Sequence, residues 1–67
     1  MSTTDVTMII EEGKIKLEAH SDRAKIIFTY KGLSPDKRNV IADDKEGEKR
    51  VEKFLNAHSL SYDVIQR

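Results

Sequence analysis

One-by-one alternation of apolar and polar residues is the feature that most restricts the fold of this sequence. It runs through three successive stretches between Val6 and Lys31. Their apolar members are Val6, Met8 and Ile10, then Ile15, Leu17 and Ala19, then Ala24, Ile26, Phe28 and Tyr30. A period of two places alternate side chains on opposite faces of a β-strand, and β-branched and aromatic residues favour strands. The pattern therefore predicts three strands.

Two short polar segments separate these stretches and determine how the predicted strands pair. A two-residue turn at Glu12-Gly13 places Met8 opposite Leu17, and a second at Ser21-Asp22 places Leu17 opposite Ile26. A slip of one residue would invert every side chain, so the match of apolar with apolar at both turns supports this register. The sequence predicts a three-stranded antiparallel meander with Leu17 at the centre of its core. Neither turn pair is among the strongest two-residue hairpin signals, which leaves a bulge or a longer loop open at either turn.

The segment from Lys31 to Asp44 is irregular in pattern. Gly32 interrupts the alternation, and Ser34-Pro35-Asp36 is typical of a turn or of the first turn of a short helix. The apolar patch at 39–42 fits either a short strand or the end of that turn.

A helix is predicted to begin at Asp43, with Asp43 or Asp44 as its N-cap. Val51, Phe54 and Leu55 then form a narrow apolar stripe at helical spacing. A single narrow stripe covers one face of one sheet, so this helix is expected to pack on the apolar face of the meander.

Residues 60–65 alternate again and predict a final strand. A helix that crosses back over the sheet makes this strand parallel to the third, and its place beside the first or the third strand stays open. The fold class expected is α+β, in the order β-β-β-α-β. Residues 1–67 are expected to form one domain, with residues 1–4 frayed.

Composition excludes several classes of protein. The chain has no cysteine, which excludes a disulfide scaffold, a cysteine-based zinc site and a thiol nucleophile. No apolar run approaches the roughly 20 residues that cross a bilayer, and the first residues lack the pattern of a signal peptide. We therefore expect a small cytoplasmic protein with no membrane partner.

The residue types that carry chemistry are scattered. His20 and His58 stand in no metal-binding or triad-like spacing, and the three glycines are isolated from one another. Asp36, Asp43 and Asp44 lack the spacing of a calcium loop, and helix capping accounts for Asp43 or Asp44. The sequence predicts no catalytic residue, no metal site and no cofactor, and hence a protein that is not an enzyme.

The sheet face that one helix leaves uncovered is the most informative surface. In the predicted register Ile9, Lys16 and Ile27 form one row across three strands, with Lys14 and Lys25 beside it. Such a patch fits a protein partner or a second copy of the chain, as in a homodimer. The alternative is that the patch binds no partner. Single exposed apolar residues are common on protein surfaces, and the stem of a lysine can cover its apolar neighbours.

Nucleic acid is the second partner considered, through the lysines of the same face. Sheet-face readers of single strands stack bases on aromatic side chains, whereas all four aromatic residues fall on the predicted core side or on the helix stripe. Basic and acidic residues are also equal in number, at 12 each. The function expected is therefore a small non-catalytic binding or regulatory module that acts by protein–protein contact.

Overall fold

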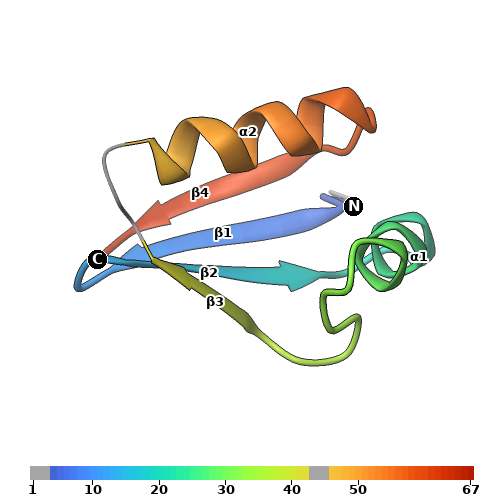
Figure 1. The fold of residues 1–67 in the computed structure, drawn as a ribbon, viewed down its shortest axis with the longest axis horizontal. Coiled ribbons are helices and arrows are strands. Elements are labelled where there is room, and N and C mark those ends of the chain that lie inside the picture. Colours follow the sequence, from blue (N-terminus) through green and yellow to red (C-terminus); the bar gives the residue numbers. More distant parts are fainter. Residues whose placement is uncertain (1–3, 43–45) are drawn as a thin grey trace.

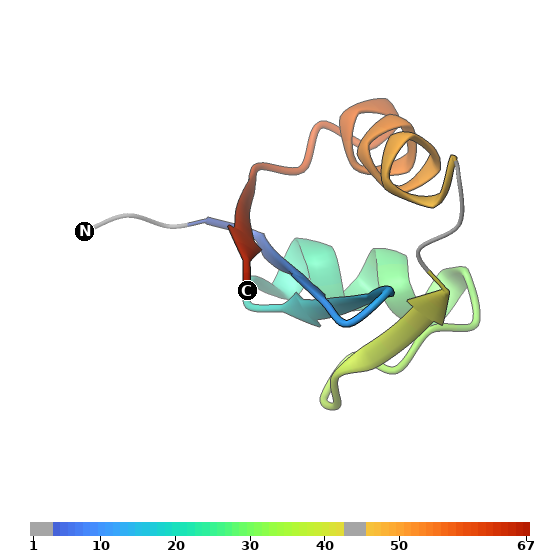
Figure 2. The same ribbon diagram turned by 90° about the vertical axis from the view of Figure 1, so that its left-hand side faces the viewer.

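The fold is an α+β arrangement of one mixed four-stranded sheet and two helices, seen in a computed structural model that describes residues 4–42 and 46–67 (Figure 1). The strand order is β3-β2-β1-β4. Helix α2 lies above the sheet in Figure 2, and α1 lies at the end of β2 in Figure 1. The elements are β1 (Val6–Glu11), β2 (Lys14–Ala19), α1 (Asp22–Tyr30), β3 (Asn39–Ala42), α2 (Gly47–Ala57) and β4 (Tyr62–Gln66).

The first hairpin has the predicted register. β1 and β2 are antiparallel, with Met8 opposite Leu17 and Ile10 opposite Ile15. The turn residues Glu12 and Gly13 have φ values of 50° and 73°. Positive φ at both central residues is the geometry whose twist matches that of the two flanking strands.

The predicted third strand is wrong: residues 22–30 form helix α1. Ser21 does not form a hairpin turn but is the N-cap of this helix, where its side chain accepts a hydrogen bond from the Ala24 N–H. Ala24 and Phe28, four residues apart, are buried, whereas Ile26 and Tyr30 are 69% and 83% exposed. The helical period therefore separates side chains that the strand pattern had grouped on one face.

Helix α1 ends in a Schellman motif. The Leu33 N–H donates to the Phe28 carbonyl at 2.7 Å, and the Gly32 N–H donates to the Thr29 carbonyl at 3.1 Å. Gly32 has a φ of 81°, which glycine adopts without the steric cost of a Cβ. The motif returns the chain toward the sheet and packs the Leu33 side chain against the core.

The other two strands complete the sheet on either side of the hairpin. β3 pairs antiparallel with β2, so the segment 39–42 takes the position predicted for residues 24–31. β4 pairs parallel with β1, which places the last strand beside the first. A final strand was predicted correctly, and of the two positions left open for it, the structure has the one beside the first strand.

Helix α2 begins at Gly47, with Glu46 as an N-cap that makes no side-chain capping hydrogen bond. The cap predicted at Asp43 or Asp44 lies outside the described residues. Val51 and Leu55 of the predicted stripe are buried, and Phe54 is partly buried against the core. Neither described helix combines the length and the apolar character that crossing a membrane requires.

One hydrophobic core joins both helices to the same face of the sheet. Its buried members are Val6, Met8, Ile15, Leu17, Ala24, Phe28, Val51, Leu55 and Leu60. The strand members are alternate residues of β1 and β2, and the helix members come from α1 and α2. Leu17 is 1% exposed, in agreement with its predicted place in the core.

A polar cluster of Asp5, Ser21 and Ser61 lies at the starts of three elements. The Asp5 carboxylate accepts hydrogen bonds from the N–H and the hydroxyl of Ser61, at 3.0 and 3.2 Å. The Ser21 side chain is the largest cause that lowers the pKa of this carboxyl, and Ser61 lowers it further. The starts of β1, α1 and β4 therefore meet at one polar cluster.

We expect Ser21→Ala to lower the free energy of unfolding by about 0.5–2 kcal/mol, since it removes the N-cap of α1. Ser21→Asn keeps a residue that caps helices well and is the matched control. Urea unfolding followed by circular dichroism measures both variants. Equal stability of Ser21→Ala and the unchanged chain would contradict the capping role.

Candidate interaction surface

The outer face of the sheet is the face opposite the core. It is defined by the strand residues that alternate with the core residues and by their cross-strand partners, since paired residues share a face. Its members are Thr7, Ile9, Glu11, Lys14, Lys16, Glu18, Val40, Asp63 and Ile65. The buried helix residues belong to the core on the other side, so neither α1 nor α2 covers this face through them.

The apolar row of the outer face consists of three apolar side chains and one lysine, with one residue on each of the four strands. Val40 pairs with Lys16, Lys16 with Ile9, and Ile9 with Ile65. Val40 and Ile65 are 58% and 39% exposed, whereas Ile9 is 4% exposed although it lies outside the core cluster. Ile9 is therefore shielded on the outer face, where its cross-strand neighbours are Lys16 and Ile65.

Lys16 holds a fixed place in this row because it forms an ion pair with Glu11, with 3.2 Å between Nζ and Oε2. The hydrogen bond and the charge of Lys16 lower the pKa of Glu11, and the charge of Arg67 adds to the effect. The lysine stem can then contribute apolar surface while its ammonium group is paired.

Polar side chains border the row at one end of the strands. Glu18 and Asp63 flank Thr7, whose hydroxyl lies 2.6 Å from the His20 Nε2. Arg38 Nε donates to Glu18 Oε1 at 2.6 Å. Because Arg38 balances the charge of Glu18, the acidic character of this end comes from Asp63.

The opposite end carries an excess of basic groups. Lys14 lies opposite Glu11 in the ladder, and Arg67 is close enough to Glu11 to influence its pKa. Arg67 is also anchored there through its N–H, which donates to the Ile10 carbonyl at 2.9 Å. The outer face thus has an apolar middle between an acidic and a basic border.

The structure brings together three of the five residues predicted for a binding surface. Ile9, Lys14 and Lys16 share the outer face. Lys25 and Ile27 lie instead on α1, where Ile27 packs against the core.

Val40 and Ile65 complete the row and were missed as site residues. The pattern at 60–65 predicted a strand, and the apolar patch at 39–42 fitted either a short strand or the end of a turn. The neighbours of both strands in the sheet were needed to place the two side chains.

The two histidines serve local contacts. His20 lies beside Thr7, and the His58 ring stands edge-on to Phe54 with centroids 5.1 Å apart. Within residues 4–42 and 46–67, no group of three or more His, Cys, Asp or Glu side chains is arranged to hold a metal ion. Comparisons of the chain with protein-family models, curated proteins and solved structures found no match.

Proposed function

We propose that this protein is a non-catalytic binding module that contacts another protein through the outer face of its sheet. The observation that carries the proposal is the apolar row on a face to which neither helix contributes core residues. An apolar centre with a polar border is the usual anatomy of a protein–protein interface. A contacting surface would remove Val40 and Ile65 from water and leave the border charges at the rim.

The charge pattern of the outer face favours a second copy of the chain as the partner. A two-fold axis along the apolar row would stack two sheets with their strands running in opposite directions. The row of one copy would then lie on the row of the other, and Asp63 at the acidic end would face the basic end with Lys14 and Arg67. Glu18 adds less to this attraction because it is already paired with Arg38. Such opposed charges favour one orientation of the two copies.

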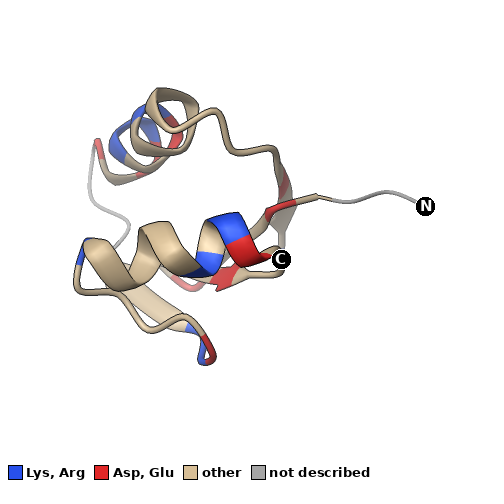
Figure 3. Cartoon of the chain, turned by 90° about the vertical axis from the view of Figure 1, so that its right-hand side faces the viewer, with Lys and Arg blue, Asp and Glu red and all other residues tan. Residues whose placement is uncertain are grey.

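Nucleic acid receives less support as the partner. Lys25 belongs to α1, and Lys16 is paired with Glu11, which reduces the positive charge offered by the outer face. Tyr62 faces the core side with Val6, and the other three aromatic residues belong to the helices, so none offers a stacking platform on this face. Basic and acidic residues also stand side by side on both helices (Figure 3).

The test is a double variant, Val40→Thr with Ile65→Thr. Both side chains are substantially exposed, and threonine suits a strand, so we expect the monomer to stay folded. Self-association should weaken by more than about tenfold, which corresponds to roughly 1.4 kcal/mol. Sedimentation equilibrium over a range of concentrations measures the association, and a thermal melt on the same sample measures folding.

A matched control removes exposed apolar surface elsewhere: Ile26→Thr with Tyr30→Thr on α1. This control should leave self-association unchanged. If the unchanged chain is a monomer throughout, the second copy is not the partner. If both double variants weaken association equally, the outer face is not the interface.

A further inference from the structure

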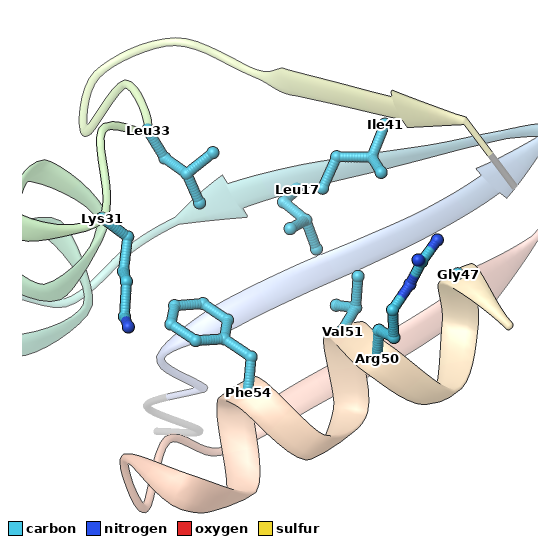
Figure 4. A pocket seen from close by; sticks show the side chains of 8 residues that line it. All are labelled: Leu17, Lys31, Leu33, Ile41, Gly47, Arg50, Val51 and Phe54. Carbon is cyan, nitrogen blue, oxygen red and sulfur yellow. The ribbon is translucent and has the colours of Figure 1, made fainter.

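An apolar hollow lies on the helix side of the sheet, away from the outer face (Figure 4). Its volume is about 320 Å³, within the range of pockets that hold small molecules. Its apolar walls come from β2, the segment after α1, β3 and α2. They are formed by Leu17, Leu33, Ile41, Val51 and Phe54.

Two cations belong to the same lining. In Figure 4 Lys31 lies at one end of the hollow near Phe54, and Arg50 lies at the other end near Gly47. Among the described residues that line the hollow, none is acidic. Lys31 therefore places a positive charge at one end of an apolar interior.

The walls are held in place by contacts that do not depend on a ligand. The Schellman motif fixes Leu33 through its 2.7 Å hydrogen bond to Phe28. Phe54 is fixed between two rings, with its centroid 6.3 Å from that of Phe28 and 5.1 Å from that of His58. A preformed wall lowers the ordering cost of binding.

Some of the lining is still open to water. Leu33, Ile41 and Phe54 are only partly buried, although each packs against the core. An apolar molecule in the hollow would cover them, and an anionic group on it would meet Lys31 in a charge-assisted hydrogen bond.

We propose that this hollow binds a small amphiphilic carboxylate. The apolar body lies against Ile41, Val51 and Phe54, and the carboxylate lies beside Lys31. This site is independent of the outer face, so the chain can carry a small ligand and a protein partner on opposite sides of its sheet.

Three probes with the same ten-carbon chain and different head groups test the proposal: decanoate, decanol and decyltrimethylammonium. Each is titrated below its micelle concentration into the ¹⁵N-labelled full chain, with amide shifts as the readout. Decanoate should shift the amides of Leu33, Ile41 and Val51 and bind at least about tenfold more tightly than decanol, a difference of roughly 1.4 kcal/mol. The cationic probe should bind more weakly than decanol.

Variants then locate the carboxylate. Lys31→Gln should weaken decanoate binding several-fold and leave decanol binding unchanged. Lys53→Gln, an exposed lysine of α2 outside the lining of the hollow, is the matched control and should change neither. The amide spectrum of each variant reports whether it is folded.

Three results would overturn the proposal. They are equal affinity for decanoate and decanol, decanoate shifts centred on the outer face, and full decanoate affinity in Lys31→Gln. The comparison of the three head groups uses the unchanged chain. It therefore tests the proposed binding of a carboxylate even where a variant fails to fold. The double variant Val40→Thr with Ile65→Thr should lose self-association and keep decanoate binding. Lys31→Gln should lose decanoate affinity and keep self-association, so failure of one proposal is distinguishable from failure of the other.

Discussion

Phe28→Ala is expected to lower the free energy of unfolding by about 3–5 kcal/mol. Phe28 is fully buried in the core, and its ring lies 6.3 Å from that of Phe54, which links α1 to α2. Alanine would lose the transfer free energy of the ring and leave a cavity between the two helices. Urea unfolding, followed by circular dichroism, measures the change.

Two neighbouring variants on α1 are the controls. Ile26→Ala and Tyr30→Ala should each change stability by no more than about 0.5 kcal/mol, because these side chains are 69% and 83% exposed. A strand would place Ile26, Phe28 and Tyr30 on one face, so it would make all three substitutions costly. Losses of similar size at the three positions would contradict the helix.

The misassignment of residues 22–30 has a definite cause. Ala24, Ile26, Phe28 and Tyr30 satisfy a period of two, whereas Ala24, Ile27 and Phe28 satisfy the helical spacing equally well. β-branched and aromatic residues then favoured the strand. A helical residue gains its stability from packing partners elsewhere in the chain, and the local pattern does not contain them.

Two signals at the ends of this segment pointed to the helix. Ser21 followed by Asp22 is a common helix start, and Gly32 stands where a helix with a left-handed C-terminal residue would end. End signals of this kind discriminate between helix and strand when the apolar pattern fits both periods.

The first hairpin was predictable because its information is local. The Glu12-Gly13 turn accepts positive φ, and the flanking residues pair apolar with apolar and Glu11 with Lys14. The same local information placed Ile9 beside Lys16 on the outer face.

Completing the apolar row required long-range pairing. β3 lies beside β2, and β4 lies beside β1, with a separate helix before each of them in the chain. The sequence pattern predicts a strand at 60–65 and leaves 39–42 as either a short strand or the end of a turn. It specifies the sheet neighbours of neither segment, so Val40 and Ile65 could not be placed. For the same reason the hollow was not foreseen, since its lining comes from β2, β3, α2 and the segment after α1.

Leu17→Ala is expected to cost about 2–5 kcal/mol of unfolding free energy. Leu17 is 1% exposed and lies on β2 between Met8 of β1 and Asn39 of β3. Its side chain also forms part of the hollow, so truncation would join a new cavity to an existing one. The neighbouring structure is then less able to collapse around the change, which favours the upper part of this range.

Lys14→Ala is the matched control on the same strand, since Lys14 is exposed; it should change stability by no more than about 0.5 kcal/mol. Urea unfolding of both variants under the same conditions gives the comparison. A loss below about 1 kcal/mol for Leu17→Ala would place this side chain outside the core and would also remove one wall of the hollow. A loss in the expected range, together with stronger binding of a longer-chain carboxylate, would show that the enlarged cavity remains open to ligand.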